Sequence, residues 1–240
     1  GNKVVGHGRP TFVVAEIGIN HNGEMALARK LIDAAALAGC DAVKFQKRTP
    51  ELCVPLAMRN VQRETPWGMM SYMQYRERME FGAEEFAAID RYCKDKGIQW
   101  FASVFDLPSL EFFRNFDMPA VKIPSCCLTD DALLAAARRS GRPVVLSTGM
   151  STWEQIQHAV KVLGGKPLTN TVLLHCTSTY PCPPAELNLR VLGTLREAFA
   201  CPVGYSGHEV GLQTTVAATV MGACFIERHI TLDRAMWGSD

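Results

Sequence analysis

Short β-branched runs alternate with longer amphipathic stretches along the whole chain, and this alternation limits the possible folds more than any other feature. The runs span residues 12–17, 42–45, 100–104, 120–123, 144–146, 172–175, 203–205 and 224–230. Stretches with apolar residues at spacings of three and four lie between them, at 25–38, 84–96, 109–116, 130–140, 152–163, 189–199 and 211–222. Unbroken alternation of strand and helix indicates one parallel sheet.

The commonest closed form of such a sheet is the (β/α)8 TIM barrel, and 240 residues is close to its usual size. A doubly wound sheet is the alternative, but no glycine-rich dinucleotide loop follows the first run. We therefore expect a single TIM-barrel domain over residues 1–240. Ser109, Thr129 and Ser151 stand where three of its helices should be capped.

Residues 52–81 are too long for a simple strand-to-helix loop and form a long excursion. This segment is either an active-site or partner-facing loop, or a helical insertion that covers the barrel mouth. Its arginines serve a phosphate or acidic substituent in the first case and form a solvated face in the second. They are Arg59, Arg63, Arg76 and Arg78.

Charge and cysteine content exclude several classes of protein. The formal net charge is +1 without a basic block, so neither nucleic acid nor a membrane surface is expected as the main partner. The longest apolar runs are far shorter than a bilayer span. Nine cysteines without a CxxC pair are expected to be reduced thiols of a cytoplasmic protein.

Polar side chains follow almost every run, at the end of a barrel where active sites are built. Because side chains alternate along a strand, Lys44 and Gln46 share one face, and so do Glu227 and His229. Two lysines among several serines predict an anion site for phosphate or carboxylate, although each lysine is alternatively a salt-bridged barrel residue.

His208 and His229 lie 21 residues apart, about one strand–helix–strand unit. Two imidazoles at the ends of neighbouring strands predict a divalent metal site, for which Mn²⁺, Zn²⁺ or Fe²⁺ suits better than Ca²⁺. The alternative is two unrelated histidines, one capping a helix and one hydrogen-bonded at a strand end.

Seven motifs together resemble the sialic acid (N-acetylneuraminate) synthase family of phosphoenolpyruvate-condensing barrels. They are AEIGINHNG (15–23), KFQK (44–47), KIPS (122–125), STGM (147–150), HCTSTYP (175–181), GYSGHEVG (204–211) and ERHITLD (227–233). They occur in order from the first strand to the eighth and cover essentially the whole chain.

The resemblance implies a transferase of carbohydrate biosynthesis that joins phosphoenolpyruvate to the open-chain aldehyde of an N-acylhexosamine. The products are a sialic-type nonulosonic acid and phosphate, released by C–O cleavage. It also implies a divalent ion, Mn²⁺ or Mg²⁺, as Lewis acid, and a homodimer. The implied acceptor is N-acetylmannosamine or its 6-phosphate.

By motif, the resemblance implies roles for single residues. His208 and His229 are the implied metal ligands, and Glu16 is an implied catalytic carboxylate at the reacting end of the acceptor. The implied substrate-binding residues are Lys44, Gln46, Ser103, Lys122, Ser125, Ser147, Ser178, Tyr180, Ser206 and Asp240. Glu227 is either an acid of the pocket or a group that supports the metal ligands.

The chain departs from the family pattern in three places. Ser178 stands where many bacterial relatives have Asn, and Cys126 and Cys127 follow KIPS where relatives have small or acidic residues. Relatives continue into an eighth barrel helix and a C-terminal antifreeze-like domain, and both are expected to be absent from residues 1–240. Two alternatives to the synthase remain: a Schiff-base pyruvate aldolase using Lys44 or Lys122, and a catalytically incomplete barrel that serves as a binding or assembly subunit.

Overall fold

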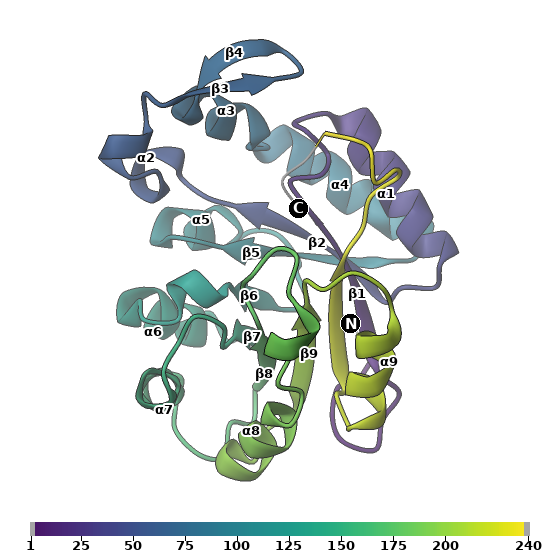
Figure 1. Cartoon of the computed structure of the whole chain (residues 1–240), viewed down its shortest axis with the longest axis vertical. Coiled ribbons are helices and arrows are strands. Elements are labelled where there is room, and N and C mark those ends of the chain that lie inside the picture. Colours follow the sequence, from purple (N-terminus) through teal and green to yellow (C-terminus); the bar gives the residue numbers. More distant parts are fainter. Residues whose placement is uncertain (1–2, 238–240) are drawn as a thin grey trace.

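Eight parallel strands close into a barrel in the computed structural model, which describes residues 3–237 (Figure 1). Around the barrel the order is β1-β2-β5-β6-β7-β8-β9-β10, and β10 pairs with β1 to close it. The strands are β1 (Phe12–Gly18), β2 (Ala42–Lys47), β5 (Gln99–Val104), β6 (Val121–Ile123), β7 (Val144–Ser147), β8 (Thr171–Cys176), β9 (Val203–Gly207) and β10 (Phe225–His229). This confirms the expected TIM barrel and excludes the doubly wound sheet.

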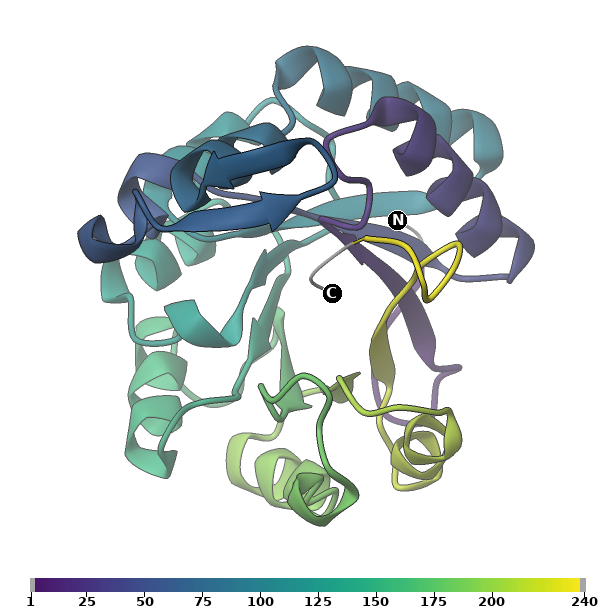
Figure 2. The same cartoon turned by 45° about the horizontal axis from the view of Figure 1, so that its top comes forward.

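Helices follow the strands and form the outer layer of the barrel (Figure 2). The α-helices are α1 (Met25–Leu37), α2 (Pro50–Cys53), α3 (Tyr72–Met79), α4 (Ala83–Lys96), α5 (Leu107–Phe112), α6 (Asp131–Arg139), α7 (Trp153–Val162), α8 (Val191–Phe199) and α9 (Gln213–Val220). Short 3₁₀ turns are η1 (Leu56–Met58), η2 (Ser125–Cys127) and η3 (Pro184–Glu186). In residues 3–237, no helix follows β10, and none of the helices has the length and apolar character needed to cross a bilayer.

The predicted helix caps were wrong by one to three residues. The side chains of Asp106, Asp130 and Thr152 accept the hydrogen bonds at the starts of α5, α6 and α7. Ser109 instead supplies the backbone N–H that Asp106 accepts, at 2.7 Å. Asp106 lies three residues before its predicted position, whereas Asp130 and Thr152 each lie one residue after theirs, so the type of cap could be predicted but not its position.

Aromatic rings fill the amino-terminal end of the barrel. Phe12 and Phe225 face each other on the paired strands β1 and β10, with ring centroids 5.4 Å apart. Phe101 of β5 packs edge-on against Phe225 at 6.5 Å. This apolar layer closes the amino-terminal end of the barrel. The polar inward-facing side chains gather at the opposite, carboxyl end.

The excursion after β2 is a β-hairpin followed by a helix, at the carboxyl end of the barrel (Figure 2). Its antiparallel strands are β3 (Gln62–Thr65) and β4 (Gly68–Ser71), and α3 begins at a capping box on Ser71. Arg63 lies 4.3 Å from the ring centroid of Tyr75, and Arg78 lies 4.2 Å from that of Trp67. These two arginines are therefore engaged with aromatic rings of the excursion itself, a contact that the sequence analysis did not predict.

Candidate active site

A cavity of about 210 Å³ opens at the carboxyl ends of the strands, and every barrel strand contributes at least one lining side chain. The predicted site residues that line it are Glu16, Lys44, Gln46, Ser103, Lys122, Ser125, Ser147, Ser178, Tyr180, Ser206, His208 and His229. Asp240 lies outside the described residues. Residues from all parts of the chain thus converge as the alternation of strand faces predicted, while their individual roles stay predictions.

The first ion pair at the cavity floor joins neighbouring strands β1 and β2. Lys44 Nζ lies 2.6 Å from Glu16 Oε2 and donates to Ser103 Oγ at 2.7 Å. Gln46 Nε2 donates to the other Glu16 oxygen at 3.0 Å. Both charged side chains are almost fully buried. These contacts orient the Glu16 carboxylate rigidly toward the cavity.

The second ion pair crosses the barrel. Lys122 Nζ donates to both carboxylate oxygens of Glu227 at 3.0 Å, and Ser206 Oγ donates to Glu227 Oε1 at 3.0 Å. Lys44 also lies 3.8 Å from Glu227, so the two pairs touch. Two lysines and two glutamates are therefore buried together, and their net charge is zero when all four are ionised.

Burial and mutual charge set the pKa values of these groups. Burial raises the pKa of Glu16 to about 7, and the charge of Glu227 adds to the rise while Lys44 opposes it. Burial alone would also raise the pKa of Glu227, but Lys122 and Lys44 hold it near 2. Burial lowers the pKa of Lys122, and Glu227 limits that fall. Two neighbouring carboxyl groups with separated pKa values are suited to different tasks, with Glu16 near neutrality as an acid or base.

Hydroxyl groups crowd one wall of the cavity. Ser125 Oγ accepts a hydrogen bond from the Gly149 N–H at 3.1 Å. A Cβ on Gly149 would lie only 2.6 Å from Ser178 Oγ and 2.8 Å from Ser125 Oγ, so this position needs glycine. Ser147, at the end of β7, is buried beside them in the same lining. Hydroxyls and lysine ammonium groups together form a donor set for an anion.

The two histidines face each other on the far side of the cavity, with ring centroids 5.5 Å apart. His208 Nδ1 lies 2.8 Å from the carbonyl oxygen of Thr177, which can only accept, so this nitrogen carries the proton. His208 Nε2 keeps its lone pair and accepts from the Tyr180 hydroxyl at 2.7 Å. The backbone carbonyl thereby fixes the tautomer that a metal ligand requires.

This donor set fits an open metal site rather than a closed one. Two imidazoles supply two nitrogen ligands, leaving the remaining positions of an ion for oxygen atoms of water or substrate. Among residues 3–237, no group of three or more His, Cys, Asp or Glu side chains is arranged to hold an ion. Glu227 contacts Lys122 and Ser206 as described, so its hydrogen bonds place it with the lysines and not with the histidines.

Several lining residues were missing from the predicted site. They are Phe105, Pro124, Cys126, Met150 and Cys176, together with Glu227, which the sequence analysis left between two roles. Cys176 stands two residues after the buried Leu174 on β8, so strand alternation could have found it. By the same alternation His175 points out of the barrel, where its Nε2 lies 2.6 Å from the carbonyl oxygen of Leu187.

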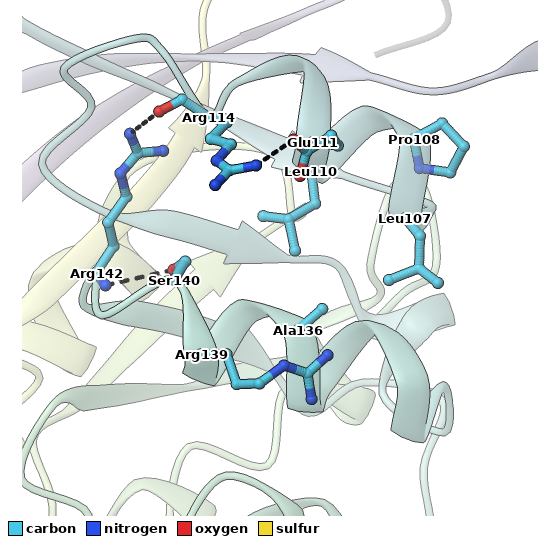
Figure 3. Close-up of a pocket in the computed structure, with 9 residues that line it drawn as sticks. All are labelled: Leu107, Pro108, Leu110, Glu111, Arg114, Ala136, Arg139, Ser140 and Arg142. Atoms are coloured by element: carbon cyan, nitrogen blue, oxygen red, sulfur yellow. Dashed lines mark hydrogen bonds and ion pairs between the residues drawn. The ribbon is translucent and has the colours of Figure 1, made fainter.

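A larger hollow, of about 730 Å³, lies outside the barrel between α5 and α6 (Figure 3). Its arginines are largely engaged with the protein itself. Arg114 pairs with Glu111 at 3.1 Å, and Arg142 donates to the carbonyl oxygens of Phe113 and Arg114. Size alone therefore does not mark a site, whereas convergent buried charges do.

Comparisons with known proteins agree on one family. The model of the NeuB family matches residues 31–240. The chain is 36% identical to the N,N'-diacetyllegionaminic acid synthase of Campylobacter jejuni, covering 97% of this chain and 71% of that protein. It is also 36% identical to the N-acetylneuraminate-9-phosphate synthase of Homo sapiens, covering 98% of this chain and 66% of that protein.

The fold has a close counterpart among solved structures. The crystal structure of N-acetylneuraminic acid (sialic acid) synthetase from Leptospira borgpetersenii, in complex with citrate, superimposes with a TM-score of 0.89. It is 33% identical, and the match covers 100% of this chain and 79% of that one. The chain spans about two thirds of the length of the curated relatives it matches.

Proposed function

The chain belongs to the NeuB family, as the motif resemblance predicted, and we propose that its barrel condenses phosphoenolpyruvate with an N-acylhexosamine. In this reaction the C3 carbon of phosphoenolpyruvate bonds to the aldehyde carbon of the open-chain sugar. Water then adds at C2, and the bond between C2 and the phosphate oxygen breaks. The products are a sialic-type nonulosonic acid and phosphate.

The observation that carries this proposal is the division of one cavity into a cationic, hydroxyl-rich side and a two-histidine side. Phosphoenolpyruvate brings a phosphate and a carboxylate, and Lys44 and Lys122 supply the two buried ammonium groups nearest the serines. Each lysine now pairs with a glutamate, so the bound anion takes over part of that pairing. Charge-assisted hydrogen bonds to both anionic groups orient the vinyl carbon toward the histidines.

A divalent ion, Mn²⁺ or Mg²⁺, would be held by His208 and His229. When bound there, it supplies Lewis-acid polarisation of the acceptor aldehyde. Tyr180 donates to the lone pair of His208 Nε2 in the structure, so its hydroxyl must turn away from that nitrogen when an ion binds. We propose that Tyr180 then donates a hydrogen bond to the acceptor sugar.

Glu16 is placed to handle protons in the reaction. Its carboxyl group is buried, and burial raises its pKa to about 7, so both protonation states are populated at neutral pH. Gln46 and Lys44 hold its two oxygens in fixed positions. A group of this kind transfers a proton to the developing alkoxide of the sugar or takes one from the attacking water.

The proposal is tested by phosphate release from phosphoenolpyruvate, N-acetylmannosamine and Mn²⁺. Phosphoenolpyruvate labelled with ¹⁸O at the bridging oxygen should deliver that label to the phosphate. Label retained in the sugar acid would contradict C–O cleavage. N-Acetylmannosamine 6-phosphate, mannose and bacterial diamino sugars should be screened in parallel to identify the acceptor.

Borohydride treatment in the presence of pyruvate distinguishes the aldolase alternative. A Schiff-base enzyme would be trapped on Lys44 or Lys122 as a covalent adduct, detectable by mass. The synthase requires no such adduct. An inert protein that still binds Mn²⁺ and phosphoenolpyruvate would favour the third alternative, a binding or assembly subunit.

A further inference from the structure

Two adjacent cysteines in the cavity wall have no part in the proposed reaction. Cys126 and Cys127 belong to η2, which directly follows β6 and its Lys122. Cys126 is exposed and lines the cavity, whereas Cys127 is half-buried. Their sulfur atoms lie 3.9 Å apart. The cavity therefore presents an accessible thiol with a second thiol in contact with it.

The surroundings of Cys126 favour its thiolate. The hydrogen bond from Cys127 is the main cause, and it outweighs burial with the help of the positive charges of Arg48 and Lys122. Together they lower the pKa of Cys126 to about 7. Contact with the Cys126 sulfur and burial raise the pKa of Cys127, so this thiol keeps its proton; its sulfur lies 3.9 Å from that of Cys126 and 3.5 Å from the carbonyl oxygen of Phe105. The pair thus consists of one nucleophilic sulfur and one donor.

The position of Cys126 couples its chemistry to the anion site. It directly follows Ser125, whose hydroxyl accepts from Gly149 at the serine-rich wall. The cavity holds only about 210 Å³, so any group added to this sulfur takes space from a bound anion. Modification at this position therefore competes with substrate.

We propose that Cys126 is a modification site for hydroperoxides, and that its oxidation reversibly blocks phosphoenolpyruvate binding. The Cys126 sulfur attacks the terminal oxygen of the peroxide, an S–O bond forms and the O–O bond breaks. Sulfur is oxidised by two electrons and the peroxide is reduced by two, leaving a sulfenic acid and hydroxide, which takes a proton from solvent. The sulfenic acid condenses with the Cys127 thiol or with a small external thiol, releasing water, and further thiol restores Cys126.

The first experiment measures alkylation of each cysteine by iodoacetamide, using peptide mass spectrometry between pH 5 and 9. Cys126 should reach half its maximal rate near pH 7, because only the thiolate reacts. Cys40 is the internal control, since it is half-buried, lies outside the cavity, and burial raises its pKa. Phosphoenolpyruvate should slow alkylation of Cys126 by about tenfold and leave Cys40 unaffected. Equal rates at both cysteines, or no protection by phosphoenolpyruvate, would overturn the proposal.

The second experiment treats the protein with hydrogen peroxide. Dimedone should label Cys126, or a Cys126–Cys127 bond should form, and phosphate-releasing activity should fall until dithiothreitol restores it. Cys126→Ser, compared with its own untreated sample, should resist inactivation. Inactivation of that variant, or oxidation of other cysteines while Cys126 stays intact, would refute the site.

A third experiment tests whether the two sulfurs have the different roles proposed for them. Cys127→Ala should slow alkylation of Cys126 at pH 7 by about tenfold, because the thiolate loses its donor. An unchanged rate would remove Cys127 from the proposal. The loss of activity rests on the proposed function, whereas alkylation and its protection need no turnover. A protein that shows protection without condensation would therefore refute the synthase and keep the thiol site.

Discussion

The charge balance of the cavity floor depends on individual residues. Glu227 accepts from Lys122 and Ser206 and also lies 3.8 Å from Lys44, so it balances the charges of the two lysines together with Glu16. Two buried ammonium groups without counter-ions would cost several kcal/mol. In the proposed function, the phosphoenolpyruvate anion would take over part of this pairing from Glu227.

Lys122→Met should raise the KM for phosphoenolpyruvate about 10- to 100-fold, the value of a lost charge-assisted hydrogen bond. The KM for the sugar should change little. Steady-state kinetics on both substrates measures the difference. Lys47→Met is the matched control, because Lys47 ends the same strand as Lys44 but pairs with Glu80 outside the cavity lining.

The single variant leaves the buried Glu227 carboxylate without its nearest partner, so it is expected to be less stable. Adding Glu227→Gln should restore stability without restoring the KM. If the double variant also recovered phosphoenolpyruvate binding, Lys122 would be a structural residue and not an anion ligand.

His208→Ala and His229→Ala should each weaken Mn²⁺ binding by about 100-fold or more, because each removes one of two protein ligands. Isothermal titration calorimetry measures this loss without any turnover. His158→Ala is the control, since His158 is exposed on α7 and contacts Asp131. Unchanged Mn²⁺ affinity in either test variant would refute the metal assignment.

His21 should make the protein sensitive to acid. Its ring stacks on Phe81 with centroids 4.0 Å apart, its Nδ1 accepts from the Gly23 N–H, and burial lowers its pKa to about 3. Below pH 6.5 the unfolded chain therefore binds a proton that the folded chain does not, and stability falls as pH falls. The free energy of unfolding should therefore be about 2 kcal/mol lower at pH 5 than at pH 7.5.

The comparison is chemical denaturation of wild type and His21→Gln at both pH values. Between pH 7.5 and pH 5, the free energy of unfolding should fall by about 2 kcal/mol less in His21→Gln than in wild type, whatever the absolute stability of the variant. Parallel pH dependence in His21→Gln and wild type would show that the imidazole is protonated in the folded state.

The excursion at residues 52–81 is held to the barrel at its end, where the chain returns to the barrel wall. Glu80, directly after α3, lies 3.1 Å from Lys47 Nζ and 3.4 Å from Arg48 Nε, and it accepts from the Arg48 N–H. Arg48 in turn donates to Gln46, which contacts Glu16. A chain of polar contacts therefore runs from the end of the excursion to the proposed catalytic carboxylate.

Glu80→Gln should destabilise this return by about 2 kcal/mol, because the buried Arg48 and the half-buried Lys47 lose their counter-charge. Limited trypsin digestion should cut faster after Arg59 and Arg63 than in wild type. Glu77→Gln, on the exposed face of α3, is the matched control and should leave the digestion rate unchanged. Equal protection in both variants would mean that the aromatic contacts alone hold the excursion.

Strands and helices with a clear hydrophobic pattern could be predicted from the sequence. Elements that form only through contact with another element could not. The run 100–104 became β5, one residue longer, because a short run without charged residues is typical of a strand buried on both faces. The hairpin strand β3 reads QRET, without an apolar face, and exists only because β4 pairs with it. The helix expected at 109–116 instead spans Leu107–Phe112, although Phe113 and Phe116 beyond it still pack on Phe86.

The same distinction holds in the cavity. Strand alternation and motifs predicted that Glu16 and Lys122 would line one pocket. They did not predict which residue forms an ion pair with each of them. Lys122 and Glu227 are 105 residues apart, and no local pattern reports a pair at that separation. Their pairing follows from barrel closure, which is a property of the whole chain.

At the scale of the molecule, the cavity belongs to no single segment. Every barrel strand supplies a lining side chain, from Glu16 on β1 to His229 on β10, and β1 and β10 are adjacent in the closed barrel. An anion bound at the floor therefore contacts parts of the chain that separate only when the barrel opens. Its binding energy should appear as global stability and not as local rigidity.

Phosphoenolpyruvate at 100 times its dissociation constant should add about 2.7 kcal/mol to the free energy of unfolding, and so raise the melting temperature by about 5–11 °C. Differential scanning fluorimetry measures the shift, with pyruvate as the control that lacks the phosphate. Hydrogen exchange should slow in β1, β6 and β10 together, because the ligand resists opening of the whole barrel. Slowing confined to one strand would place the anion at the surface of a single loop, outside the barrel floor that Lys44, Lys122 and Glu227 define.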